Sequence, residues 1–96
     1  MTPEGKVKAK LKDQLRKQGV YWFMPVQTGY GATSLDFLCC ELGEFVAYEC
    51  KAHGGKMTPR QELVARQITA AGGSVFVVTL DANGELELKR VDRSRA

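Results

Sequence analysis

The feature that most constrains the fold is an apolar run, residues 45–50, which ends among charged residues of opposite sign. Its length and composition predict a β-strand. Side chains alternate between the two faces of a strand, so Glu49 and Lys51 are expected on one face and Cys50 on the other. A carboxylate and an ammonium at the end of a buried strand cost free energy unless they are paired or used. This strand is therefore expected to carry part of the core and a functional site.

The other apolar segments predict a single small α/β domain over residues 1–96. The chain has 44% hydrophobic and 26% charged residues, which is typical of a globular domain with one modest core. Helices are expected after Thr2-Pro3 and Thr58-Pro59, because threonine caps a helix and proline suits its first position. Strands are expected over residues 20–26, 35–40, 44–51, 74–80 and 85–91. The order helix, three strands, helix, two strands predicts a small mixed sheet flanked by helices.

Each expected helix has an apolar stripe that should face the sheet. The stripe of the first helix consists of Val7, Leu11 and Leu15, and that of the second consists of Val64, Ile68 and Ala71. Gly19 is expected to end the first helix and Gly72-Gly73 the second. A polar loop with two glycines is expected over residues 27–34, and a loose tail over residues 92–96.

Charge and cysteine content narrow the function classes. The net charge is +3, and residues 1–19 hold six basic side chains against two acidic ones. Such a helix suits contact with an acidic polymer, although a solvated helix face has the same composition. No apolar run approaches the roughly 20 residues that cross a membrane, and no secretory signal is expected. The thiols of Cys39, Cys40 and Cys50 are expected to be buried and reduced, as in a cytoplasmic protein.

Two other polar groups are weaker candidates for a site. A zinc site built on Cys50 and His53 would lack two good ligands. His53, the only histidine, lies in an expected loop with no evident partner, so it is not assigned a role.

A pair of carboxylates gives the strongest argument for a site. If the turn between the second and third strands is centred on Leu42-Gly43, Asp36 falls opposite Glu49, with β-carbons about 5 Å apart. Like charges so placed raise each other's proton affinity. A bound divalent cation would remove the conflict, and Lys51 would relieve it in part. The pattern Glu-x-Lys occurs three times in the chain, and only this occurrence has an aspartate on the preceding strand.

These residues resemble a known family. Asp36, followed after twelve residues by Glu49-Cys50-Lys51, resembles the core of the PD-(D/E)XK nucleases. Over nearly its whole length the chain resembles the virus-type replication-repair nuclease (VRR-Nuc) branch in its minimal stand-alone form. The further segments that carry this resemblance are Gly31, Gly54-Gly55-Lys56, Thr58-Pro59-Arg60-Gln61 and residues 70–73. One departure is Leu35, where the family often has proline, and that position shapes the backbone rather than the chemistry.

The resemblance implies a restriction-endonuclease-like fold and a ligand set for Mg²⁺ or Mn²⁺. Asp36 and Glu49 would hold the ion, with the main-chain carbonyl of Cys50 as a further ligand and Glu4 contributing through water. Carboxylates are the hard ligands that these cations prefer. Glu4 has a second interpretation, because an acidic residue in the first turn is also favoured by the helix dipole.

Two more residues are implied to act in catalysis. Lys51 would position or deprotonate the attacking water, or stabilise the transition state. Gln61 would orient Lys51 or the water, although a capping box with Thr58 explains this glutamine equally well.

The resemblance also implies the substrate and the assembly. DNA would be bound through its backbone by exposed basic side chains, namely Lys8, Lys12, Lys56, Arg60 and Arg66. Stand-alone members of the family look like homodimers that cut four-way junctions or other branched DNA. Apolar positions on the last strand and an exposed Trp22 region are the two candidates that the sequence offers for a dimer interface, and it does not choose between them. The sequence thus predicts a metal-dependent DNA endonuclease, with a catalytically silent DNA-binding module or a plain interaction domain as alternatives.

Overall fold

The computed structural model describes residues 1–26 and 34–92, so nearly all of the loop expected over 27–34 and of the tail expected over 92–96 lies outside it. The predicted order of helices and strands is confirmed. The helices are α1 (Pro3–Lys17) and α2 (Pro59–Ala70), and the strands are β1 (Tyr21–Phe23), β2 (Phe37–Glu41), β3 (Glu44–Cys50), β4 (Ser74–Leu80) and β5 (Leu86–Arg90). Neither helix is long and apolar enough to cross a membrane, within the described residues.

The five strands form one mixed sheet in the order β1-β2-β3-β4-β5. Only β3 and β4 are parallel among these neighbours, because α2 forms the crossover between them. The β2–β3 turn has Leu42 at φ 50° and Gly43 at φ 82°, the left-handed backbone that suits a tight hairpin. This turn pairs Phe37 with Tyr48. The next pair along this register is Asp36 and Glu49, as predicted from the position of the turn.

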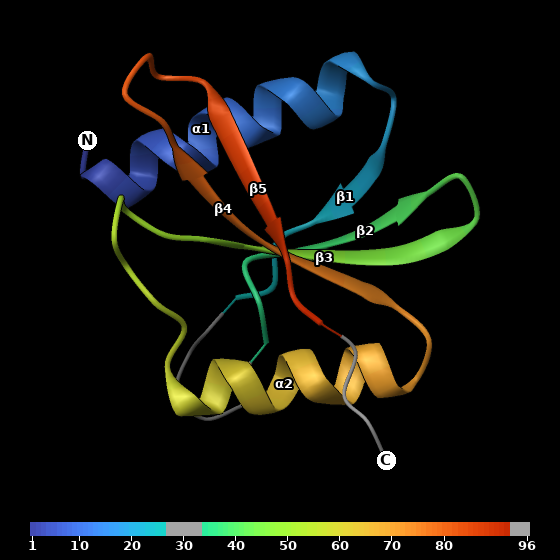
Figure 1. The fold of residues 1–96 in the computed structure, drawn as a ribbon. Coiled ribbons are helices and arrows are strands. Elements are labelled where there is room, and N and C mark those ends of the chain that lie inside the picture. The colour runs from blue at the N-terminus through green and yellow to red at the C-terminus, as the bar shows by residue number, and fades with distance from the viewer. Residues whose placement is uncertain (27–33, 93–96) are drawn as a thin grey trace.

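The helices cover opposite faces of the sheet (Figure 1). The stripe of α1 is confirmed, because Val7, Leu11 and Leu15 are each at most 2% exposed and pack on one face with Phe37 and Cys50. On the other face the core is smaller and consists of Leu35, Ala47, Ala65 and Val75.

The stripe predicted for α2 is partly wrong. Ala65 and Thr69 are the buried residues of this helix, while Val64 and Ile68 are only partly buried. Ala71 is exposed, because α2 ends at Ala70 and Ala71 forms its C-terminal cap. The small Ala65 is thus buried in the core of this face, and the larger Val64 and Ile68 pack against that core from partly exposed positions.

Two predictions about burial near β1 are also wrong. Cys39 and Cys50 are buried, and burial raises the pKa of each thiol to about 12, but Cys40 is exposed. Trp22 is not the exposed residue of β1, because its ring packs 5.8 Å from that of Phe37 on the α1 face. Alternation along the strands explains both errors: the α1 face covers Cys39 and Trp22, while their neighbours point toward the other face.

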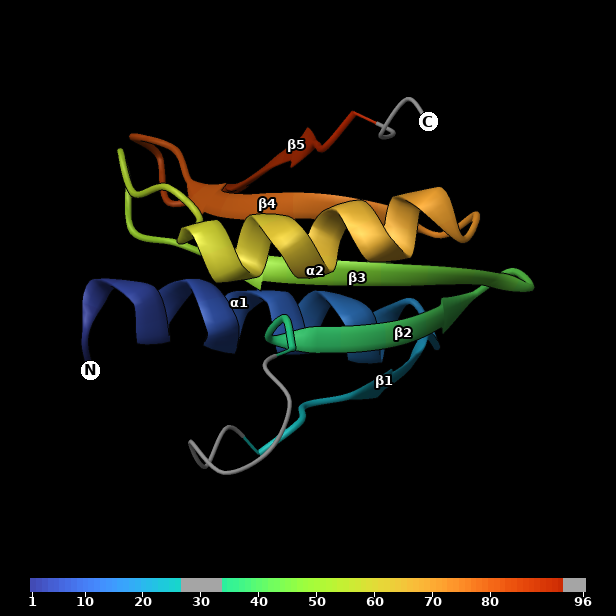
Figure 2. The same ribbon diagram turned by 90° about the horizontal axis from the view of Figure 1, so that it is seen from below.

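The fold brings three chain segments to one end of the sheet. The N-termini of α1 and α2 both lie at the end where β3 finishes, as two perpendicular views show (Figures 1 and 2). Asp36, just before β2, is at the same end because β2 and β3 are antiparallel. Residues far apart in the sequence are therefore neighbours at this end.

Candidate metal centre

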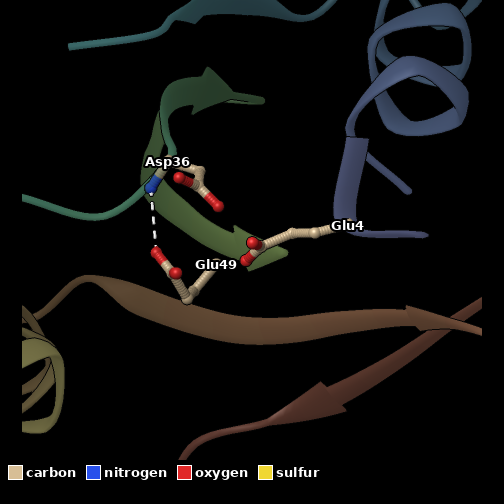
Figure 3. Close-up of side chains that lie close together, drawn as sticks. All are labelled: Glu4, Asp36 and Glu49. Atoms are coloured by element: carbon tan, nitrogen blue, oxygen red, sulfur yellow. Dashed lines mark hydrogen bonds between the residues drawn. The ribbon is translucent and has the colours of Figure 1, made fainter. Parts of the chain in front are cut away.

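Three carboxylates from three different elements converge at this end of the sheet (Figure 3). Glu4 comes from the first turn of α1, Asp36 precedes β2, and Glu49 is the penultimate residue of β3. One oxygen from each carboxylate lies within 4.8 Å of the others. The structure thus brings together the three acidic side chains that the sequence singled out. Glu4 therefore lies in the carboxylate cluster, and it is also an acidic residue in the first turn of α1, where the helix dipole favours it.

Asp36 and Glu49 hold each other in place through the backbone. The amide of Asp36 donates to Oε1 of Glu49 at 3.1 Å, and the amide of Cys50 donates to Oδ2 of Asp36 at 3.0 Å. The backbone pairing of β2 and β3 ends at Phe37 and Tyr48, and these two side chains continue the hydrogen bonding between the strands beyond that pair. The positions of both carboxylates are therefore tied to the strand register.

Glu49 is a buried carboxylate with a polar partner at each oxygen. It is 1% exposed, and its second oxygen, Oε2, receives Nε2 of Gln61 at 3.0 Å and lies 3.3 Å from Nζ of Lys51. The pKa of Glu49 is raised to about 7, mainly by burial and secondly by the charge of Asp36, while Lys51 and the hydrogen bond from the Asp36 amide act in the opposite direction. The predicted conflict between the two carboxylates is therefore visible in the pKa of Glu49.

Gln61 connects the start of α2 to the site. Its backbone amide donates to Oγ1 of Thr58 at 3.2 Å, and its side-chain Oε1 accepts from the amide of Thr58 at 3.0 Å, so the predicted capping box is confirmed. The other end of the same side chain donates to Glu49. Gln61 therefore combines a capping role with a contact to the site, and its partner there is Glu49 rather than Lys51.

Lys8 has a position that the sequence did not predict. It lies one turn after Glu4 on α1, and its Nζ is 3.5 Å from Oδ1 of Asp36. The sequence assigned Lys8 only to DNA binding. Its four-residue spacing from Glu4 was the available signal, because residues at that spacing share a helix face. The three carboxylates are thus accompanied by two ammonium groups, those of Lys8 and Lys51.

The other predicted DNA-binding residues lie outside the carboxylate cluster. Lys12 is partly buried on α1, and Lys56, Arg60 and Arg66 are exposed. Lys56 lies in the segment that leads into α2 and Arg60 in the first turn of that helix, which starts at the same end of the sheet as the carboxylates. Lys56 also lines a surface groove of about 410 Å³ together with Lys89 of β5.

The donor set fits a hard divalent cation. Carboxylate oxygens are the ligands that Mg²⁺ and Mn²⁺ prefer, and a cation would offset the charge conflict around Glu49. A zinc site on Cys50 and His53 does not form among the described residues, because the Cys50 thiol is buried in the α1-face core and His53 is exposed. A contribution from the main-chain carbonyl of Cys50 stays a prediction.

No family model matches the chain, and no curated protein matches it. The interpretation of the site therefore depends on its residues and their geometry.

Proposed function

We propose that the protein is a metal-dependent DNA endonuclease of the PD-(D/E)XK type, similar to minimal VRR-Nuc domains. The observation that carries the proposal is the convergence of Glu4, Asp36 and Glu49, with Lys51 paired to the same Glu49 carboxylate. Both the register of Asp36 against Glu49 and the order of elements agree with the pattern that suggested the family. The fold by itself supports many activities, so the site is the basis of the assignment.

In this proposal the three carboxylates would hold Mg²⁺ or Mn²⁺. The ion would supply Lewis acidity toward the phosphate and lower the pKa of a bound water. Asp36 and Glu49 are held by backbone amides, so they are ready to bind without rearrangement of the strands. Gln61 fixes the rotamer of Glu49 from the other side.

Lys51 is proposed to act on the substrate side of the site. Its side chain is 13% exposed and lies against Glu49, so it stands next to any phosphate that the cluster binds. An ammonium held in an ion pair is suited to position the water and to stabilise the negative charge that develops on the phosphate. We therefore favour these two roles over proton abstraction.

DNA would reach the site across the basic side chains at this end of the molecule. Lys56 and Arg60 precede and begin α2, and Lys8 and Lys12 follow Glu4 along α1. Contacts of this kind bind the DNA backbone without reading its sequence. A homodimer with two such sites would suit paired cuts in a four-way junction, in keeping with the resemblance.

A cleavage panel tests the proposal. Labelled four-way junction, flap and linear duplex DNA are incubated with the protein in Mg²⁺, in Mn²⁺ and in EDTA. We expect cleavage in at least one of the two metals and none in EDTA. Lys51→Met should abolish cleavage while retaining DNA binding, and Lys17→Met, at the far end of α1, is the matched control.

Two outcomes would contradict the assignment. Undiminished cleavage by Lys51→Met would remove the lysine from the mechanism. Salt-dependent DNA binding without cleavage in any metal would instead support the alternative, a catalytically silent DNA-binding module on the same fold.

A further inference from the structure

The ion pair between Lys8 and Asp36 occupies a position where a metal ion would compete with it. Nζ of Lys8 is 3.5 Å from Oδ1 of Asp36, and the Asp36 side chain is 16% exposed. Asp36 is one of the three carboxylates whose oxygens converge. Its other oxygen, Oδ2, accepts the amide of Cys50. Lys8 is thus paired with the Asp36 oxygen that does not accept the amide of Cys50.

The charges of the cluster show why this pairing matters. The negative charge of the three carboxylates is offset in part by the ammonium groups of Lys8 and Lys51. A divalent cation bound to carboxylate oxygens stands about 2.0–2.6 Å from them. It would therefore lie close to both ammonium groups, in a partly buried place where water screens repulsion poorly. Entry of the cation favours departure of at least one ammonium.

The surroundings of the two lysines indicate which one leaves. The Lys51 side chain is 13% exposed, and its backbone amide donates to the carbonyl of Val78 at 2.9 Å, which extends the strand pairing. The Lys8 side chain is 34% exposed and belongs to the solvent-facing flank of α1. Lys8 can therefore move into water at smaller cost, while Lys51 stays beside Glu49.

We propose that Lys8 is the resident counter-ion of the metal-free site and that the metal displaces it from Asp36. This inference rests on the proposed metal site. Metal loading and release of the Lys8 ammonium are then a single event. The released ammonium stands at the rim of the loaded site, where it is free to meet a DNA phosphate. Metal and DNA binding are thereby coupled in the favourable direction, and linkage makes this coupling reciprocal.

Calorimetric titration with Mn²⁺ alone tests the competition. Lys8→Met keeps an unbranched side chain, one heavy atom shorter, and removes its charge. We expect it to bind Mn²⁺ about threefold to tenfold more tightly than the wild type. The variant lacks the ammonium that competes for Asp36, and the strength of that competition is comparable to that of a surface ion pair. Lys8→Arg should restore the wild-type affinity. Lys17→Met is the matched control, because Lys17 also pairs with an aspartate, Asp13 at 3.0 Å, but at the far end of α1.

The outcomes separate this inference from the proposed function. An Mn²⁺ affinity of Lys8→Met that equals or falls below that of the wild type would overturn the displacement of Lys8 and leave the metal site standing. Absence of Mn²⁺ binding to the wild type would overturn the metal site itself, and the inference with it.

A second measurement uses the unmodified protein. Surface amines are acetylated briefly with an activated acetate ester, with and without saturating Mn²⁺, and peptide mass spectrometry gives the extent of labelling at each lysine. Labelling of Lys8 should rise when Mn²⁺ is bound, while that of Lys17 stays constant. Unchanged labelling of Lys8 in the Mn²⁺-saturated protein would contradict the proposal.

Discussion

The two helices begin in the same way, yet they contribute to the site differently. Each starts with a Thr-Pro pair, and each threonine hydroxyl accepts the backbone amide three residues later, at 3.0 Å in α1 and 3.2 Å in α2. Both starts lie at the same end of the sheet (Figure 1). In α2 the third residue after the threonine is Gln61, which closes the capping box and reaches Glu49. In α1 that position is Gly5, and the acidic group, Glu4, comes one residue earlier.

The difference separates a side chain that is hydrogen-bonded at both ends, Gln61, from a partly exposed one, Glu4, that we propose as a metal ligand. The side-chain amide of Gln61 is hydrogen-bonded at both ends: its oxygen accepts the backbone amide of Thr58, and its nitrogen donates to Glu49. Glu4 is partly exposed in the first turn of its helix, where a carboxylate is also favoured by the helix dipole. Both helices thus begin with a threonine cap followed by proline, and only α2 adds a capping box; the residues that follow the threonine decide which side chains reach the site.

The largest effect is expected from Glu49, the carboxylate on which both helix starts converge. Glu49→Gln keeps the shape of the side chain but removes its charge and one acceptor oxygen. We expect single-turnover cleavage in Mn²⁺ to fall by at least about 10³-fold, which corresponds to about 4 kcal/mol of lost transition-state stabilisation. A decrease in the cleavage rate of less than tenfold would show that Glu49 is not a ligand of the catalytic metal.

The next effect is a dependence of stability on pH in the metal-free protein. The pKa of Glu49 is raised to about 7 in the folded state, from an ordinary value near 4.5. The folded state therefore binds the proton more tightly, so stability from this group is fully present below pH 4.5 and is lost as the pH rises through 7. We expect a loss of about 3 kcal/mol between pH 4.5 and 8 in EDTA. Urea unfolding measures it, relative to Glu49→Gln. If the free energy of unfolding changed with pH equally in the wild type and in Glu49→Gln, the raised pKa of Glu49 would be contradicted.

A smaller effect is expected from Gln61, which is hydrogen-bonded to both Thr58 and Glu49. Gln61→Met removes the acceptor of the cap and the donor to Glu49, so the free energy of unfolding should fall by about 2 kcal/mol. Gln67→Met, on the exposed side of the same helix, is the matched control. Gln61→Glu keeps the capping acceptor but places a second carboxylate beside Glu49. It should therefore destabilise the metal-free protein more at pH 8 than at pH 5, and a pH-independent effect would reduce Gln61 to a cap.

The smallest effect is expected from Glu4, the partly exposed member of the proposed ligand set. Glu4→Gln should weaken Mn²⁺ binding about tenfold and change the free energy of unfolding by less than about 1 kcal/mol. Glu62→Gln is the matched control, because Glu62 is the acidic residue in the first turn of α2. Calorimetric titration measures the affinity. Equal affinities for the Glu4 and Glu62 variants would leave Glu4 with the helix-dipole role alone.

Local signals in the sequence predicted most of the framework. The Thr-Pro pairs and the stripe of α1 depend on contacts within one helix, and the turn at Leu42-Gly43 determines the register that brings Asp36 opposite Glu49. A hairpin joins residues that are close in sequence, so its register can be counted from the turn.

Contacts between distant segments were harder to predict. The pairing of Lys8 with Asp36 depends on how α1 lies across the end of the sheet, and the burial of Ala65 depends on how closely α2 approaches the strands. The exposure of Cys40 depends on which part of the sheet α2 leaves uncovered. Periodicity indicates which side of an element is apolar, but it does not place that element against its neighbours.

The most direct test of the account is the position of a bound metal. Crystals grown with Mn²⁺ are measured at the manganese absorption edge, and an anomalous difference map locates the ion. The expected result is a peak within coordination distance of Asp36 and Glu49, on the side that faces Glu4, with Lys8 moved away from Asp36. A map with no peak at these carboxylates, from a crystal that contains Mn²⁺ elsewhere, would contradict it.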